Sequence, residues 1–399
     1  MRVLILTKIF PNCVEPLSSP FNRQQFVELA RLCEVHILAT IPWFPGARAF
    51  SAWSRAGRLF DVPKKESIDG ISVRHPRFLF VPRMLPALSG PLYAASLATT
   101  ALGYRGKVDI VLGSWAYPDG FAAVLLAEML RVPAVIKVHG SDMNVVAQLA
   151  GPRHALKWAL PRAERVVAVS EPLRDAAIRF GVPAGRVDVV PNGIDRARFR
   201  PQDRAAARSA LGLPIDRRMV LCVGNIEAHK GSLDLVRAFA ALAKRRKDAS
   251  LVMVGDGAAR AECERLTRRL GIKVSFVGAR RHDEVPQWIA ACDVLTLPSW
   301  NEGTPNVVLE ALACGRRVVA TRVGGTPAVI TSDTLGVLVP PRDPVALASA
   351  IEEALERRWQ YDAAAVAAAL DAPDWRDSAQ RLQASLVAAR TSVARAAAA

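Results

Sequence analysis

The sequence predicts an α/β protein made of two doubly wound parallel sheets. Short apolar runs of strand type alternate with helical stretches along both halves of the chain, which is typical of parallel sheets covered by helices. The chain has 399 residues, of which 51% are hydrophobic, so it can bury the cores of two ordinary domains. Pro201 and charged residues interrupt the pattern at residues 198–203, where we expect the two domains to join.

Each predicted strand is an apolar run bounded by polar or turn-forming residues. In the first half these runs are Val3–Leu6, Val35–Ala39, Ile110–Leu112, Ala134–Val138, Arg165–Val169 and Val187–Val190. In the second half they are Met219–Val223, Leu251–Val254, Val274–Val277, Val294–Leu297 and Val318–Thr321. We assign residues 1–200 to the first domain and 201–374 to the second, followed by an alanine-rich helical tail that frays.

Composition favours an enzyme of a reducing compartment. The six cysteines form no C-x-x-C pair, and the apolar run after Met1 is too short for a signal peptide. No run of about eighteen apolar residues is free of charge, so we expect a cytoplasmic protein that does not span a membrane. The net charge of +16 favours polyanionic partners such as a membrane's inner face, although compositional drift also explains it. No nucleic-acid-binding motif is present, so nucleic acid is not expected as a partner.

The segment from Trp300 to Gly315 is the most informative part of the chain. It follows a predicted strand and places Glu302 in a loop and Glu310 in the helix after it, with seven residues between them. Thr304 is a suitable N-cap and Pro305 a suitable first helical residue, so the amides of the first turn should face the loop and attract phosphate. Carboxylates beside such a site suit the hydroxyls of a sugar and a ribose. The alternative is that Glu302 caps the helix and Glu310 is solvated.

Several ordered motifs extend along nearly the whole chain. They are Val138-His-Gly-Ser-Asp142, Val169-Ser-Glu-Pro-Leu-Arg-Asp175, Val190-Pro-Asn-Gly-Ile-Asp195, Val223-Gly-Asn-Ile-Glu-Ala-His-Lys-Gly231, Val254-Gly-Asp-Gly257 and Val323-Gly-Gly-Thr-Pro-Ala-Val329. With the E-x7-E segment, this set resembles the retaining glycosyltransferases of family four (glycosyl transferases group 1). The resemblance implies the GT-B fold, in which two Rossmann-like domains face each other across a cleft and the helix near residues 375–390 returns to the first domain.

The resemblance also implies roles for individual residues. His139 and Glu302 would lie at the sugar, Glu310 at the ribose and Lys230 at the pyrophosphate, with the donor also contacted by Asn225, Arg280, Gly303, Thr304, Asn306 and Val307. Asn225 stands where the family has an arginine, and Arg280 or Arg281 could replace that charge. The alternatives without a catalytic role are that His139 binds a loop carbonyl and that Lys230 is a solvated loop lysine.

On the acceptor side, Ser18 and Ser19 stand where the family often has a glycine pair. The stretch Ser114-Trp-Ala-Tyr-Pro-Asp-Gly120 resembles a subgroup that builds cell-surface polysaccharides in the cell envelope, and Asp119 could bind an acceptor hydroxyl. Packing of Trp115 and Tyr117 under the loop is an equal alternative. An aromatic and basic run from Trp43 to Phe60, followed by Phe78-Leu-Phe-Val-Pro82, is a candidate peripheral membrane contact or else core packing.

No D-x-D motif occurs, so we expect no metal and no cofactor beyond the nucleotide-sugar co-substrate. The expected activity is hexosyl transfer from a nucleoside diphosphate sugar to a polysaccharide or lipid-linked glycan. Two alternatives remain open at this point. A nucleotide-sugar epimerase or hydrolase would turn over donor without acceptor, and an inactive binding paralogue would bind donor without turnover.

Overall fold

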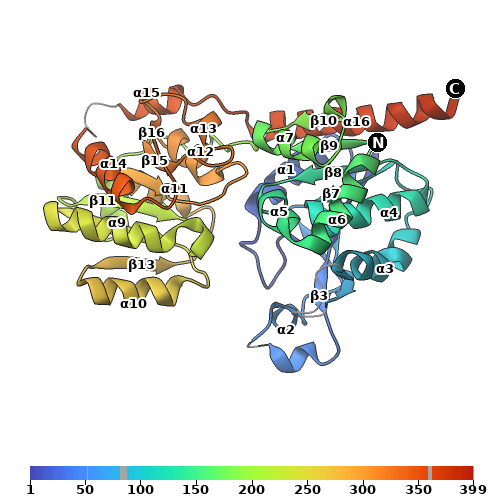
Figure 1. The fold of residues 1–399 in the computed structure, drawn as a ribbon, viewed down its shortest axis with the longest axis horizontal. Helices are drawn as coiled ribbons and strands as arrows, with labels where there is room; N and C mark the ends of the chain where they lie inside the picture. The colour runs from blue at the N-terminus through green and yellow to red at the C-terminus, as the bar shows by residue number, and fades with distance from the viewer. Residues whose placement is uncertain (52, 81–87, 358–361, 399) are drawn as a thin grey trace. The chain divides into compact units, whose positions relative to one another are not determined.

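The computed structural model describes residues 1–51, 53–80, 88–357 and 362–398, and the chain divides into two compact units (Figure 1). One unit is Met1–Gly193 with the segment from Trp375 onward, and the other is Ile194–Asp374. Ile194 forms a bridge with Asp374, and its amide donates to the Pro373 carbonyl at 3.0 Å. The predicted interruption at residues 198–203 lies inside the second unit because Phe199 is buried in that unit's core.

The first unit is built on an eight-stranded sheet in the order β10-β9-β8-β7-β1-β2-β5-β4. Its strands are β1 (Arg2–Thr7), β2 (Glu34–Ala39), β4 (Lys65–Ile68), β5 (Ile71–Arg74), β7 (Ile110–Ser114), β8 (Ala134–Val138), β9 (Arg165–Ala168) and β10 (Val187–Val189). Neighbours pair in parallel except β4, which is antiparallel to β5. A separate parallel pair, β3 (Ile41–Trp43) and β6 (Arg77–Leu79), was not predicted, and neither were β4 and β5.

Both faces of this sheet are covered. Leu4 and Leu6 point into one apolar cluster, whereas Val3 and Ile5 point into the other, so β1 is buried on both sides. The principal helices are α1 (Pro20–Ala30), α2 (Arg55–Arg58), α3 (Ser89–Leu102), α4 (Phe121–Leu130), α5 (Ser141–Asn144), α6 (Ala150–Ala159), α7 (Glu171–Arg179) and α16 (Trp375–Ala398). Helix α16 packs in the first unit, where the Ser378 hydroxyl accepts from Gln25 at 2.8 Å and donates to the Pro191 carbonyl at 2.6 Å.

The second unit has a six-stranded, fully parallel sheet in the order β13-β12-β11-β14-β15-β16. Its strands are β11 (Arg218–Val223), β12 (Ala249–Val254), β13 (Val274–Gly278), β14 (Val294–Leu297), β15 (Val318–Thr321) and β16 (Gly336–Val339). Its helices are α8 (Arg204–Ala210), α9 (Ser232–Arg245), α10 (Arg260–Leu270), α11 (Val285–Ala291), α12 (Asn306–Ala313), α13 (Thr326–Val329), α14 (Pro344–Glu356) and α15 (Ala363–Ala368). The prediction of two doubly wound α/β sheets is confirmed.

The strand order of each sheet reverses once. The reversal lies between β1 and β7 in the first unit and between β11 and β14 in the second. Ligands of such sheets bind beyond the carboxyl ends of the strands at the point of reversal. The loops that follow these four strands are therefore where each unit's functional side chains are to be sought. In the described part of the chain, no helix is both long enough and apolar enough to span a bilayer.

Candidate functional site

Glu302 and Lys230 meet at the reversal point of the second sheet. Glu302 lies in the loop after β14, and Lys230 lies in the loop after β11. Glu302 Oε1 is 2.8 Å from Lys230 Nζ and accepts a second hydrogen bond from Ser299 Oγ at 2.6 Å. The Glu302 side chain is 9% exposed and that of Lys230 is 28% exposed. The site thus holds a largely buried ion pair in which both members are engaged.

Glycines allow the loops of this site to approach closely. Gly231 has a φ of +67°, and a Cβ there would lie 2.0 Å from the Pro298 carbonyl oxygen, so the Lys230 loop packs directly on the loop after β14. Gly324 has a φ of +51°, and a Cβ there would lie 1.9 Å from the Glu302 carbonyl oxygen. The Gly325 amide donates to the Gly303 carbonyl at 2.9 Å. The Val323–Val329 motif therefore supports the backbone that carries Glu302.

The helix after Glu302 begins slightly later than the sequence predicted. α12 starts at Asn306, its N-cap position is Pro305, and no side chain caps it, so the N-cap assignment of Thr304 is wrong. The amides of Val308 and Leu309 both donate to the Pro305 carbonyl, at 2.9 and 3.3 Å. Because Pro305 itself closes the first turn, Gly303 and Thr304 stay in the preceding loop. Asn306 and Val307 are the first two helical residues.

Glu310 is held by a residue that sequence reasoning did not select. Its Oε1 lies 2.8 Å from Nε2 of His282, and both side chains are largely buried. His282 Nδ1 lies 3.2 Å from Nη1 of Arg198. Because a guanidinium can only donate, Nδ1 accepts and the ring proton is on Nε2, which donates to Glu310. This chain of contacts fixes the orientation of the Glu310 carboxylate, so the alternative of a freely solvated Glu310 does not hold.

The remaining predicted donor residues are more exposed. Asn225 is exposed in the loop after β11, where a Cβ on Gly255 would lie 1.9 Å from the Gly224 carbonyl oxygen. The Val254–Gly257 motif thus lets this loop approach the strand end. Arg280 donates to its neighbour Ala279 at 3.3 Å, and Arg281 forms an ion pair with Asp283, which already neutralises part of its charge.

His139 directly follows β8 in the first unit and is 9% exposed. Its Nε2 is 3.0 Å from Ser114 Oγ, and its ring lies 5.8 Å from that of Trp115 and 5.3 Å from that of Phe21. Burial, assisted by the positive charge of Lys137, lowers the pKa of His139 well below its usual value of 6.5. The imidazole is therefore neutral at physiological pH and cannot serve as a cation.

Asp142 organises the loop that carries His139. Its fully buried carboxylate accepts hydrogen bonds from the amides of Ala116 at 2.8 Å, His139 at 3.1 Å, Gly140 at 2.7 Å and Met143 at 3.1 Å. Burial raises the pKa of Asp142, and these amides oppose the rise. The aspartate of the His-Gly-Ser-Asp motif thus has a structural function, which joins the loops after β7 and β8.

The structure corrects the acceptor-side prediction for Asp119. Its carboxylate is fully buried and accepts a short hydrogen bond from the Tyr93 hydroxyl, so it does not face an acceptor. Burial raises the pKa of Asp119 to about 7. Tyr117 is buried and its hydroxyl accepts from the Gly90 amide at 2.7 Å, which confirms the packing alternative for that residue. Trp115 is partly exposed, and Lys8 Nζ lies 5.4 Å from its ring centroid.

Ser19 keeps a backbone conformation that glycine adopts more easily. Its φ and ψ are 47° and 57°, in the left-handed region, at the residue before α1. A serine in this region carries a Cβ that glycine lacks, so the conformation of Ser19 has a cost in strain.

Two further expectations concern exposed aromatics and metals. Trp43, Phe50 and Trp53 are 37%, 52% and 87% exposed, whereas Phe78 is buried, and Val81 and Pro82 of the same prediction lie outside the described residues. Within the residues that the structure describes, no three His, Cys, Asp or Glu side chains are grouped to hold a metal ion.

Two family models match this chain, one in each half. Residues 23–198 match the model described as glycosyltransferase family 4, and residues 217–357 match glycosyl transferases group 1. A putative teichuronic acid biosynthesis glycosyltransferase, TuaC of Bacillus subtilis (strain 168), is 31% identical over 357 residues, which cover 88% of each chain. A D-inositol 3-phosphate glycosyltransferase of Catenulispora acidiphila is 31% identical over 322 residues, which cover 74% of each chain.

Solved structures share the fold at lower identity. Anabaena HepE in complex with UDP and glucose superposes with a TM-score of 0.71 at 21% identity, over 97% of this chain and 99% of that one. Sucrose-phosphate synthase from Thermosynechococcus elongatus gives a TM-score of 0.71 at 22% identity, over 99% and 98% of the two chains. The chain is therefore a glycosyltransferase of the GT-B fold and belongs to family 4, the glycosyl transferases group 1.

Proposed function

We propose that this glycosyltransferase moves a hexose from a nucleoside diphosphate sugar to a polysaccharide or lipid-linked glycan, with retention of the anomeric configuration. The observation that carries the proposal is the pairing of Lys230 with Glu302 beside the start of α12. Such a site offers a cation and helix amides to a diphosphate and a carboxylate to sugar hydroxyls. Solved structures of the same fold contain UDP or UDP-glucose, and TuaC is named for teichuronic acid biosynthesis.

Each part of the donor has a partner in this proposal. Lys230 and the amides of Asn306 and Val307 hold the diphosphate, and Glu310 binds the ribose hydroxyls. The contact between His282 and Glu310 supports the second assignment because it orients the carboxylate before ligand arrives. Glu302 accepts hydrogen bonds from the sugar hydroxyls. For this contact its ion pair with Lys230 must break, and Lys230 then pairs with the diphosphate.

Retention of configuration follows in this proposal because an acceptor hydroxyl attacks on the face from which the diphosphate departs, and the departing phosphate oxygen takes the hydroxyl proton. Positive charge then develops at the anomeric carbon, and the Glu302 carboxylate stabilises it electrostatically. We assign His139 a positioning role at the sugar, because a neutral imidazole can exchange hydrogen bonds but brings no charge. Lys230 and the helix amides stabilise the negative charge of the departing diphosphate.

We also propose that transfer needs no metal ion, since Lys230 and the start of α12 supply positive charge where the diphosphate would bind. Transfer measured in excess EDTA should match the untreated rate. Loss of activity that magnesium restores would contradict this part of the proposal.

The exposed aromatics of the first unit support a peripheral contact with the inner face of the membrane, where a lipid-linked acceptor would be found. Trp43 and Trp53 expose their rings, and Arg48 and Arg58 lie in the same segment. A Trp43→Ser/Trp53→Ser variant should sediment less with lipid vesicles than the unaltered protein does. Equal sedimentation would remove this segment from the proposal.

A ligand screen tests the main proposal. Thermal shifts with UDP, GDP and ADP sugars should reveal one stabilising donor, because a ligand that binds the folded state raises its stability in proportion to occupancy. That donor should then be consumed faster when glycan acceptors are present. Rapid consumption without acceptor would instead favour an epimerase or hydrolase, and binding without turnover on any acceptor would favour an inactive binding paralogue.

A further inference from the structure

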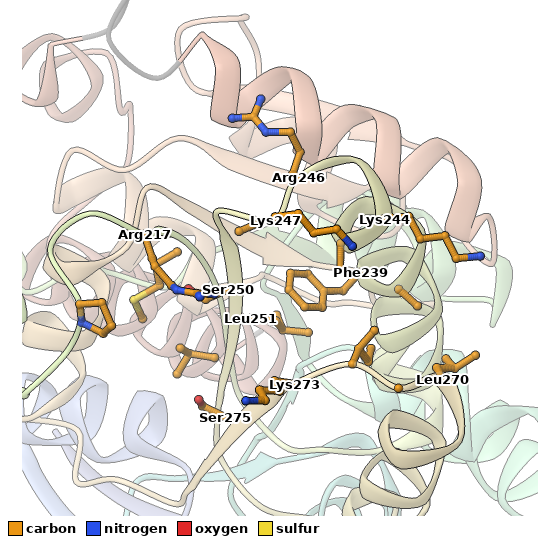
Figure 2. Close-up of a pocket in the computed structure, with 18 of the residues that line it drawn as sticks. Arg217, Phe239, Lys244, Arg246, Lys247, Ser250, Leu251, Leu270, Lys273 and Ser275 are labelled. Carbon is orange, nitrogen blue, oxygen red and sulfur yellow. The ribbon is translucent and has the colours of Figure 1, made fainter.

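A cavity lies in the second unit at the end of the sheet opposite Glu302 (Figure 2). Its volume is about 450 Å³, within the range of small-ligand sites. Arg217 and Lys273 lie just before β11 and β13, and Ser250 is the second residue of β12. These are the amino ends of parallel strands, whereas Glu302 follows the carboxyl end of β14. We call this feature the basic cavity.

The lining of the basic cavity is positively charged. It contains Arg217, Lys244, Arg246, Lys247 and Lys273 and no aspartate or glutamate. Of the lining cations, Arg246 pairs with Asp248 and Glu356. Asp248 also pairs with Arg218, and Glu352 pairs with Arg245, neither of which lines the cavity. Over the described ranges of the chain, no ion pair engages Arg217, Lys244, Lys247 or Lys273. Four of the five lining cations are thus exposed and have no ion pair among the described residues.

Helix ends explain only part of this charge. Lys244 lies in the last turn of α9, where a cation offsets the negative end of the helix dipole, and in Figure 2 its ammonium points away from Arg217 and Lys273. Arg217 and Lys273 precede strands, so the dipole does not account for them.

The cavity also has an apolar part. Leu270 and Ile272 contribute exposed hydrocarbon surface, and Ser250 and Ser275 contribute hydroxyls, whereas Phe239 and Leu251 lie behind them in the core. Cations and hydroxyls next to apolar side chains suit an anion that carries hydrocarbon. A free inorganic anion would use only the polar half of such a lining.

We propose that the basic cavity binds a phosphate ester with an apolar substituent, at a site separate from the donor site. Arg217, Lys247 and Lys273 hold the phosphate, and Leu270 and Ile272 contact the substituent. The phosphate belongs either to a lipid headgroup or to a soluble metabolite, and the two sources share this chemistry.

The test compares two double variants by titration calorimetry with inorganic phosphate and with hexyl phosphate. Lys247→Gln/Lys273→Gln removes two cations from the cavity. Arg268→Gln/Arg269→Gln removes the same charge from the last turn of α10, outside the lining. The unaltered protein should bind hexyl phosphate more tightly than inorganic phosphate. The cavity variant should bind hexyl phosphate about tenfold more weakly, and the α10 variant should bind it as the unaltered protein does.

Equal binding by all three proteins, or an equal loss in both variants, would overturn the proposal. Donor affinity measured on the same proteins should be unchanged, which separates this inference from the donor-site assignment. Sedimentation with vesicles of phosphatidylcholine, alone or mixed with phosphatidylglycerol, identifies the source. If the protein binds anionic vesicles and the cavity variant does not, the phosphate belongs to a lipid headgroup. Hexyl phosphate binding without vesicle binding assigns a soluble ester.

Discussion

Glu302→Gln and Lys230→Met should change the affinity for a nucleoside diphosphate in opposite directions. The Lys230 ammonium is bound to Glu302 at 2.8 Å, so a diphosphate must compete with this carboxylate for the same cation. Glu302→Gln removes both the competitor and a negative charge beside the anion site. Lys230→Met removes the cation itself.

The exposure of the pair sets the magnitude. With Glu302 9% and Lys230 28% exposed, the pair lies between a surface and a buried ion pair. Releasing Lys230 from it should contribute about 1 kcal/mol to diphosphate binding, which is roughly a fivefold gain in affinity. A charge-assisted contact to phosphate contributes about 1.5–3 kcal/mol, so Lys230→Met should weaken binding by roughly ten- to a hundredfold.

Titration calorimetry with the nucleoside diphosphate of the selected donor measures both effects. Using the diphosphate without its sugar keeps the proposed contact between Glu302 and the sugar out of the comparison. Glu227→Gln is the matched control, because it removes a negative charge from the Lys230 loop at a residue whose side chain accepts from the Ala258 amide. Weaker binding by Glu302→Gln, or an equal gain in the Glu227 control, would refute the competition between Glu302 and diphosphate.

Three other changes should give measurable effects. Ser19→Gly should raise stability by roughly 0.5–1 kcal/mol in calorimetric unfolding, because a left-handed residue loses its Cβ strain, and a lower Tm would contradict this. Because the pKa of His139 is lowered in the folded state, only the unfolded chain binds a proton at His139 just below pH 6.5. The free energy of unfolding should therefore fall as the pH drops below 6.5. In denaturant titrations, His139→Gln should make this fall smaller. His282→Ala should raise the donor KM about three- to tenfold with little change in kcat, because Glu310 loses its orienting donor. His282→Gln retains an N–H, so its donor KM should rise less. Equal donor KM values in the two variants and the unaltered protein would exclude the orienting role.

The sequence was sufficient for the strands that are buried on both faces. Apolar runs such as Val3–Leu6 and Ile110–Leu112 have no polar position that would allow a different assignment. β16 at the sheet edge was missed although Val337–Val339 is an apolar run, because the run has only three residues. β4 and β5 were missed because they are short and alternate exposed polar residues with apolar ones.

The candidate site was predictable to the level of loops but not of contacts. Motifs at strand ends brought Lys230 and Glu302 to the same edge because carboxyl ends of parallel strands meet there. Their ion pair depends on side-chain directions that spacing does not encode. His282 comes from the loop after β13 and carries no family motif, although its position beyond a strand's carboxyl end was a usable signal. Asp119 was misassigned because Tyr93, on a distant helix, buries it.

Hydrogen–deuterium exchange with and without the selected nucleotide sugar tests most directly whether the donor is held where β14 leads into α12. Saturating donor should slow exchange at the amides of Gly303, Asn306 and Val307 and at the Lys230 loop, because these groups are proposed to bind the diphosphate. Unchanged exchange at all of these amides, with protection elsewhere in the chain, would contradict the donor site proposed for this enzyme.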